Sequence, residues 1–170
     1  LEFRRVLFRS DLAPLVAFET NVGTFLVELA PAHAPKTVAN FLQYVNAGHY
    51  NGTIFHRVIP NFMAQAGGYD DQLREKSTRA PVEHEGRKAL QGGLRNQVGT
   101  IAMARTNDPQ SATSQFFINV ANNDFLDPIA IPPGDPVAEF TYRGRTYRNV
   151  PRDRKSTRLN SSHVKRSRMP

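Results

Sequence analysis

The chain has no cysteine among its 170 residues, and it has no long unbroken run of apolar residues. The lack of cysteine excludes a disulfide framework, a thiolate metal site and a thiol nucleophile. No run approaches the roughly 18 apolar residues that a membrane-spanning helix needs. The five histidines lie far apart, without metal-ligand spacing. We therefore expect a protein that binds no metal ion and no membrane.

Motifs that mark covalent or acid–base catalysis are missing as well. The sequence contains no G-x-S-x-G turn, no phosphate-binding glycine loop and no paired acidic motif. No nucleophile with a neighbouring base and an orienting residue stands out either. These absences argue against an enzyme that works through a covalent intermediate or a proton transfer, and we expect no cofactor.

Positive charge is concentrated at the two ends of the chain. The formal net charge is +7, of which residues 1–10 carry +2 and residues 151–170 carry +6, whereas the body between them carries −1. Both ends resemble translated restriction-site or adapter sequence. We expect a non-native or disordered segment at 1–10 and a disordered, basic, non-native tail at 151–170. The alternative for the tail, which we do not favour, is a basic arm that binds nucleic acid.

Alternating apolar residues predict a β-hairpin at the start of the body. Residues 16–20 and 24–29 both alternate, and Gly23 between them can take the positive φ of a tight turn. The period then changes from two to 3.6. A helix is predicted there, with Pro35 in its first turn and Gly48 just after its end. Its apolar stripe consists of Val38, Phe41, Leu42 and Val45.

Further segments have the composition of strands, and a later region predicts a small hairpin. The strand candidates are Ile54–Ile59, Thr100–Ala104 and Gln115–Val120. The connection 67–98 has no clear period, which is typical of a functional or irregular loop. Four prolines within 127–136 predict an extended connector, and 138–141 with 146–150 predict a hairpin. We interpret residues 128–150 as a connector and a hairpin insertion.

Side-chain alternation sorts the strand residues into two faces. Phe55, Arg57 and Ile59 share one face of the first candidate, which Pro60 must end. In the candidate strand Gln115–Val120, the core face consists of Phe116, Ile118 and Val120. The opposite face consists of Gln115, Phe117 and Asn119. If the strands are neighbours, one concavity is lined by Arg57, Met63, Gln65, Gln115 and Phe117. Such a set would hold an apolar ring and polarise an adjacent amide.

Two segments carry a resemblance to a known family. They are F-H-R-V-I-P-N-F-M-A-Q-A-G-G at 55–68 and G-L-R-N-Q-V-G-T-I-A-M-A-R-T-N-D-P-Q-S-A-T-S-Q-F-F-I-N-V-A-N-N-D-F-L-D at 93–127. They resemble cyclophilins, the peptidyl-prolyl cis–trans isomerases, of bacterial type. The resemblance implies a mainly β fold, an antiparallel β-barrel with capping helices. The family's last strands and second helix find no match after residue 127, so we expect a partial domain over 11–127 with one capping helix and an incomplete, poorly stable barrel.

Site residues follow from the same resemblance, position by position. It implies that Arg57 is the catalytic residue. The residues that it implies in substrate binding are Phe62, Met63, Phe117 and Leu126 at a proline pocket, Gln65 and Gln115 as positioning amides, Ala104 and Arg105 along the peptide, and Phe125 where animal relatives commonly have tryptophan. No metal ligand is implied.

The function that the resemblance implies is the acceleration of rotation about X–Pro peptide bonds during protein folding. Its substrates would be proline-containing peptides and unfolded proteins, and family resemblance adds cyclosporin-like ligands; we expect a monomer without nucleic-acid partners. The alternative is a chaperone module that binds proline segments without turnover because the barrel is truncated. Residues 1–10 make a poor signal peptide and the native start is expected to be absent, so the cytoplasm and the periplasm both stay open.

Overall fold

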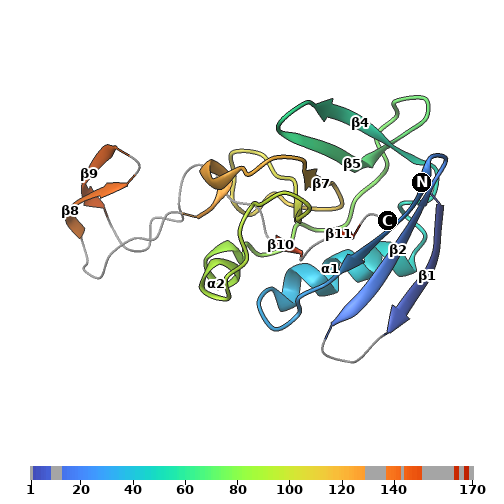
Figure 1. Cartoon of the computed structure of the whole chain (residues 1–170), viewed down its shortest axis with the longest axis horizontal. Coiled ribbons are helices and arrows are strands. Elements are labelled where there is room, and N and C mark those ends of the chain that lie inside the picture. Colours follow the sequence, from blue (N-terminus) through green and yellow to red (C-terminus); the bar gives the residue numbers. More distant parts are fainter. Residues whose placement is uncertain are drawn as a thin grey trace.

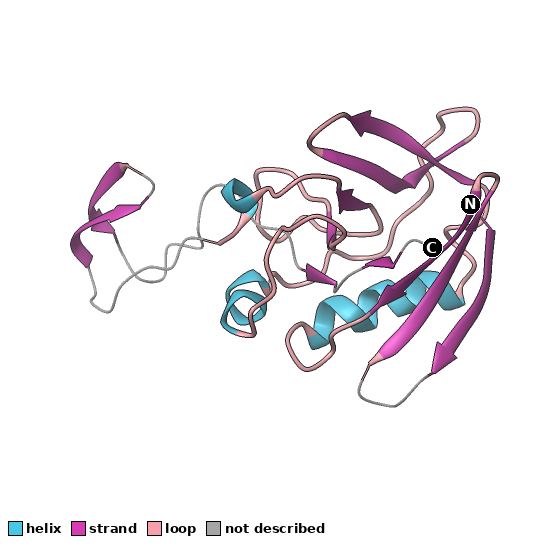
Figure 2. Cartoon of the chain, viewed as in Figure 1, coloured by secondary structure: helices cyan, strands magenta, loops and turns pink. Residues whose placement is uncertain are grey.

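A computed structural model describes residues 2–8, 13–128, 137–142, 144–150, 163–164 and 167–168. Within them the fold is mainly β, with antiparallel sheets and few helices (Figures 1 and 2). In chain order the elements are β1 (Glu2–Phe8), β2 (Pro14–Thr20), β3 (Gly23–Glu28), α1 (Pro35–Asn46), β4 (Thr53–Ile59), β5 (Met63–Asp70), α2 (Gly86–Gln91), β6 (Ile101–Met103), β7 (Phe116–Asn119), a 3-10 turn (Asp124–Leu126), β8 (Val137–Tyr142), β9 (Arg145–Val150), β10 (His163–Val164) and β11 (Ser167–Arg168).

The strands form separate sheets rather than one closed barrel. The order is β1-β2-β3-β11 in the first sheet and β10-β6-β7-β5-β4 in the second, and β8 pairs with β9 in a hairpin that stands apart (Figure 1). This arrangement agrees with the expected mainly β, incomplete antiparallel barrel. Among the described residues, no helix follows the 3-10 turn. The short helix α2 was not predicted and interrupts the connection 67–98, where no period announced it.

Strands occur among the described residues at both ends of the chain, and the expected disorder of 1–10 and 151–170 stays a prediction. Strand β1 pairs antiparallel with β2, while the two-residue strands β10 and β11 pair with β6 and β3. The physical reason is that the open edges of β2, β3 and β6 offer unpaired backbone groups to any extended segment. The non-native origin of the two ends stays a prediction.

Helix α1 begins and ends where the sequence predicts. Pro35 is its first residue, and Gly48 follows its end with a φ of +65°. The Gly48 N–H donates to the Val45 carbonyl and the His49 N–H to the Tyr44 carbonyl, both at 3.0 Å. This pair of bonds is a Schellman motif, which satisfies the last carbonyls of a helix and favours glycine at the left-handed position.

The first turn of α1 is capped from a distant part of the chain. Glu85 accepts hydrogen bonds through Oε2 from the Thr37 N–H at 2.8 Å and from Thr37 Oγ1 at 2.9 Å. Glu85 is buried, and a carboxylate at this end of a helix also favours the helix dipole. Because Glu85 directly precedes α2, the contact fastens the connection 67–98 to α1.

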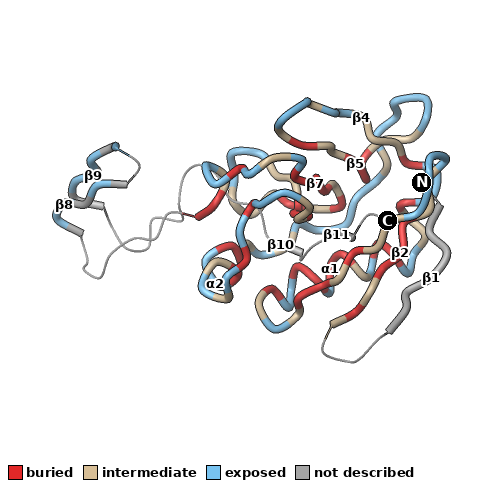
Figure 3. The backbone as a smooth tube through the Cα atoms, in the orientation of Figure 1, coloured by how far each residue is buried: buried red, intermediate tan, exposed pale blue. Residues whose placement is uncertain are grey.

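The main core is an aromatic cluster centred on Phe116. The Phe116 ring lies 5.4 Å from Phe18, 5.9 Å from Phe41 and 5.5 Å from Tyr50, measured between ring centroids. Apolar residues of β2, β3, α1 and β6 complete this buried layer, which Figure 3 shows in red. A Cβ at Gly67 would lie 2.8 Å from Tyr50 and 3.0 Å from Phe116, and Gly67 has a φ of +88°. Only glycine fits beside this cluster.

The two faces of β7 separate as alternation predicts, with one exception. Phe116 and Ile118 belong to the main core, whereas Phe117 packs with Met63 on the opposite face. The prediction that Val120 points into the core is wrong, because Val120 is 43% exposed. Strand β7 ends at Asn119, so the alternation that places a side chain on one face no longer applies to Val120.

Burial makes His49 a source of pH-dependent stability. Its ring packs against Tyr44 and Tyr50 at centroid distances of 4.7 and 5.4 Å, and its Nε2 lies 3.2 Å from the Gly67 carbonyl oxygen. Desolvation lowers the pKa of His49, and neighbouring positive charges act in the same direction, whereas the contact with Gly67 acts against them. The folded protein therefore binds a proton at His49 less readily than the unfolded chain does.

Acidification is consequently expected to destabilise the fold. The contribution of His49 is present above its ordinary pKa of 6.5 and is lost as the pH falls through the lower pKa of the folded state. The urea midpoint of unfolding should fall between about pH 7 and about pH 5, and less so in His49→Phe. Burial also lowers the pKa of His56, which accounts for a residual slope. An unchanged slope in His49→Phe would exclude this role.

Candidate active site

Pairing of four strands aligns the first site residues in one row. Arg57 on β4 lies opposite Gln65 on β5, Gln65 lies opposite Phe117 on β7, and Phe117 lies opposite Ala102 on β6. Residues opposite each other in register point to the same face of a sheet. Segments distant in the sequence thereby present one continuous surface.

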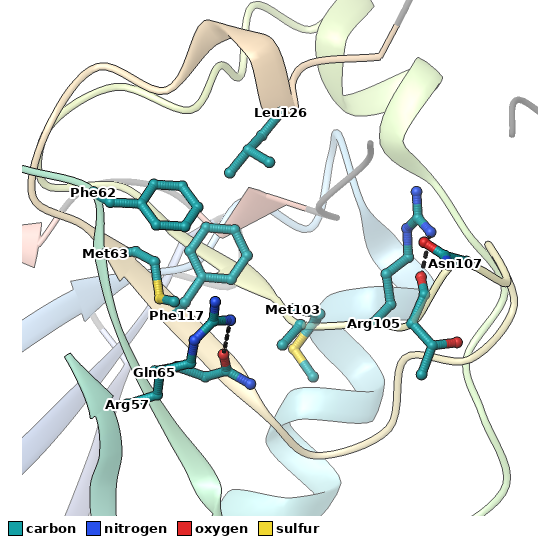
Figure 4. A pocket seen from close by; sticks show the side chains of 11 residues that line it. Arg57, Phe62, Met63, Gln65, Met103, Arg105, Asn107, Phe117 and Leu126 are labelled. Carbon is teal, nitrogen blue, oxygen red and sulfur yellow. Dashed lines mark hydrogen bonds between the residues drawn. The ribbon is translucent and has the colours of Figure 1, made fainter. Parts of the chain in front are cut away.

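A cavity of about 460 Å³ opens over this surface (Figure 4). Eight residues predicted from the sequence line it, namely Arg57, Phe62, Met63, Gln65, Ala104, Arg105, Phe117 and Leu126. Sequence reasoning missed three other lining residues, which are Met103, Thr106 and Asn107. The sequence could have indicated these three residues, because they flank Ala104 and Arg105 within the same motif. Figure 4 shows Met103 between the Phe117 side of the cavity and Arg105.

The floor and walls of one side of the cavity are apolar. Phe117 and Met63 are 9% and 3% exposed and form a small cluster with Ala102. Phe62 and Leu126 pack against this cluster. Figure 4 shows both of them on one side of the Phe117 ring, with Arg57 on the other. The arrangement is a slot whose size and polarity suit a small apolar ring.

A line of polar contacts runs from Arg57 along the rim of this slot. Arg57 is exposed, and its Nη1 lies 3.5 Å from Gln65 Oε1, to which it donates. Gln65 in turn donates from Nε2 to Gln115 Oε1 at 2.8 Å. Figure 4 shows the guanidinium of Arg57 beside the Phe117 ring. Gln115 does not line the cavity, but its hydrogen bond orients Gln65. The positive donor at the rim is a guanidinium, which is always charged in proteins.

Gly68 provides the space that Gln115 occupies. A Cβ at this position would lie 2.5 Å from Gln115 Cγ and 2.6 Å from its Cδ. The φ of Gly68 is not positive, so the backbone itself accepts other residues. Gly68→Ala is therefore expected to displace Gln115 from Gln65 with little loss of stability. If the cavity is an active site, kcat/KM should fall about tenfold because a positioning contact is lost.

The control for this prediction is the double variant Gly68→Ala with Gln115→Ala. Once the Gln115 side chain is removed, the added methyl group has nothing to displace, so the two losses should not add. Steady-state kinetics of the four proteins measure the coupling, and thermal unfolding measures their stability. Fully additive losses of kcat/KM would show that Gly68 does not act through Gln115.

The opposite end of the cavity carries a second cation. Arg105 is half-buried, and its Nη1 donates to the Thr106 carbonyl oxygen at 2.6 Å. Burial lowers the pKa of Arg105, and the negative charge of Asp108 acts in the opposite direction. The cavity is thus bordered by a guanidinium at each end, with apolar side chains between them.

Phe125 lies outside the lining of the cavity. Its ring stacks on Phe62 with centroids 5.6 Å apart and an angle of 27° between the planes, and Phe125 is 48% exposed. The structure therefore places Phe125 behind one wall of the slot. Direct contact of Phe125 with a substrate stays a prediction.

No group of three or more histidine, aspartate or glutamate side chains able to hold a metal ion exists within the described ranges. In the same part of the chain, no helix is long and apolar enough to cross a membrane.

The described residues thus combine an antiparallel sheet with an apolar slot that has a charged donor at its rim. The profile of the family "Cyclophilin type peptidyl-prolyl cis-trans isomerase/CLD" matches residues 15–144. The chain belongs to this family.

Relatives and solved structures support the same family. The peptidyl-prolyl cis-trans isomerase of Streptomyces antibioticus is 56% identical over 112 residues, which cover 66% of this chain and 65% of the relative. A cyclophilin from Hirschia baltica superposes with a TM-score of 0.55 and 29% identity over 74% of this chain and 63% of its own. A cyclophilin-type isomerase of Cryptosporidium parvum, studied with the dipeptide Ala-Pro, gives a TM-score of 0.51 and 27% identity over 66% of this chain and 71% of its own. The chain spans just under two thirds of the Streptomyces protein.

Proposed function

We propose that this protein accelerates cis–trans isomerisation of X–Pro bonds in peptides and unfolded proteins. The observation that carries the proposal is the position of Arg57, whose exposed guanidinium lies beside the apolar slot formed with Phe117 and Met63. Membership of the family supports it, as does the relative studied with Ala-Pro. A cyclosporin-like cyclic peptide would fit the same slot, and we propose that the protein acts as a monomer.

The chemistry requires no covalent step. An X–Pro bond rotates over a barrier of about 18–20 kcal/mol because the prolyl nitrogen shares its lone pair with the carbonyl group. Midway through rotation the lone pair is localised on nitrogen and accepts a hydrogen bond. A guanidinium aimed at this nitrogen therefore binds the twisted state better than either planar state, which is what lowers a barrier. In the proposal Arg57 is this donor, and the slot holds the proline ring still.

The remaining roles follow the layout of the cavity. Gln65, oriented by Gln115, would receive the substrate carbonyl group that swings during rotation. Ala104 and Arg105 border the cavity beyond Met103, where the residues before proline would lie. Each role is a proposal that rests on position in the cavity and on the resemblance to cyclophilins.

A second candidate is a module that binds proline segments without turnover. The open sheets favour it, because a barrel that is not closed holds its site less rigidly. A binding module and an enzyme would both take up the same peptides. They differ in whether the bound X–Pro bond exchanges faster.

Exchange spectroscopy of a labelled Ala-Pro peptide separates the two candidates. Uncatalysed exchange takes tens to hundreds of seconds, so exchange cross-peaks between the cis and trans forms appear within a second only with a catalyst. The proposed enzyme should produce such cross-peaks at substoichiometric concentration. Peptide binding without these cross-peaks would favour the binding module, and the absence of both would overturn the proposed function.

A further inference from the structure

The turn that carries Phe62 is held by a buried amide. Asn123 donates from Nδ2 to the Phe62 carbonyl oxygen at 2.8 Å, and the Val120 N–H donates to the same oxygen at 3.1 Å. Asn123 is 2% exposed, so these bonds form in a region of low dielectric where they are stronger than in water. Two donors from the segment after β7 thus fix the backbone of one wall of the slot.

Other buried polar side chains continue this contact behind the slot. Asn123 also donates to Asn119 Oδ1 at 2.7 Å, and Asn119 donates from Nδ2 to Asn96 Oδ1 at 3.2 Å. Asn96 donates from its backbone and side-chain nitrogens to Asp127 Oδ1 at 2.8 and 2.9 Å. None of the four residues is more than 2% exposed. We call Asn96, Asn119, Asn123 and Asp127 the amide network.

The amide network encloses the 3-10 turn that presents Leu126. Asn123 and Asp127 flank this turn, and the Leu126 N–H donates to the Asn123 carbonyl oxygen at 2.8 Å. Asn123 therefore contacts both the Phe62 turn and the Leu126 turn. The side chains of Phe62 and Leu126 lie on the same side of the Phe117 ring, facing the cavity (Figure 4).

We propose that Asn123 is a positioning residue that fixes Phe62 relative to Leu126 and so sets the width of the slot for the proline ring. The inference rests on the proposed function. A wider slot would hold the ring less tightly, which weakens binding of the planar substrate and of the twisted state alike. Loss of such uniform binding raises KM and leaves kcat nearly unchanged.

The matched control is Asn122, the preceding residue with the same side chain. Asn122 is exposed, and its Oδ1 accepts a hydrogen bond from the Val98 N–H at 3.0 Å rather than contacting the Phe62 carbonyl group. Asn123→Ala and Asn122→Ala each remove one side-chain amide from the same segment. Only Asn123→Ala should raise KM for an Ala-Pro peptide, by about tenfold.

A spectroscopic readout exists that does not depend on turnover. Met63 and Met103 line the cavity, and the third methionine, Met169, lies outside the described residues. Labelled methionine methyl groups therefore report on the slot directly. In the peptide-free protein, Asn123→Ala should shift the Met63 signal, whereas Asn122→Ala should leave it in place.

Each outcome decides the inference. A higher KM with kcat retained in Asn123→Ala supports the inference. An intermediate KM in Asn123→Ser supports it as well, because serine keeps a shorter hydrogen-bond donor. The serine variant also replaces the alanine variant if the latter does not fold. A lower kcat that follows the folded fraction, with KM unchanged, would mean a purely structural role and overturn it. An equal rise of KM in Asn122→Ala would overturn it as well.

If the parent protein shows no turnover, the proposed function fails, but peptide titration of the methionine methyl signals still tests the inference. Weaker peptide binding in Asn123→Ala than in Asn122→Ala supports the inference. Equal peptide binding in the two variants refutes it.

Discussion

Arg57→Ala is expected to lower kcat/KM for an Ala-Pro peptide by about 100- to 1000-fold, the range found when one donor to a transition state is removed. The loss should fall mainly on kcat, because the donor is engaged fully only when the bond is twisted and the nitrogen lone pair is free. The apolar slot does not require the guanidinium to hold the ring. Peptide binding, followed through the methionine methyl signals, should therefore persist.

Two further variants make this prediction specific. Arg57→Lys keeps the charge but loses the rigid fork of donors, so it should restore only part of the activity. Arg87→Ala removes one positive charge from an exposed position of α2 that is not part of the lining of the cavity, and should retain the parent rate. Equal rates in Arg57→Ala and the parent protein would remove the basis of the proposed mechanism. Equal loss in Arg87→Ala would attribute the effect to net charge.

Phe116→Ala is expected to have the largest effect on stability. The ring is fully buried and contacts Phe18, Phe41 and Tyr50, which come from three separate parts of the chain. Removal of a buried phenylalanine ring typically costs about 3–5 kcal/mol through lost transfer energy and the cavity left behind. Because small domains are stable by only about 5–15 kcal/mol, this variant should be largely unfolded under conditions where the parent is folded.

The neighbouring phenylalanine provides the comparison. Phe117 points to the opposite face and forms the floor of the slot, in a small cluster with Met63 and Ala102. Phe117→Ala should cost less stability than Phe116→Ala and should weaken peptide binding in the protein that remains folded. Urea unfolding followed by far-ultraviolet circular dichroism measures the first effect, since the chain has no tryptophan. Similar unfolding midpoints for the two variants would contradict this division of roles.

Much of the local structure could be predicted from the sequence. The alternation of β7 separated Phe116 from Phe117, and Pro35 with Gly48 marked both ends of α1. These features depend on the period of neighbouring residues and on backbone preferences that proline and glycine impose. The motif around Arg57 could also be recognised in the sequence, because its residues are consecutive.

Other parts of the site were beyond such reasoning. Gln115 was expected in the lining, yet it lies outside the lining and accepts a hydrogen bond from Gln65. The predicted burial of Val120 was wrong because the end of a strand depends on its partners. The amide network gave no sequence signal, since exposed and buried asparagines look identical in a sequence.

The amino-acid sequence by itself determined the mainly β class, the bounds of α1, the opposite faces of Phe116 and Phe117, and the family. It did not determine the face of Phe55, because an irregularity in β4 between Phe55 and Arg57 places Phe55 against the main core and Arg57 opposite Gln65. Those properties arise from the local period and from consecutive motifs. The tertiary structure alone decided which strands neighbour one another, how Arg57 meets Phe117 across two strand pairs, and which of two adjacent asparagines is buried against Phe62. The physical reason is that strand register and buried hydrogen bonds join residues far apart in the chain, and only the packed fold brings these partners together.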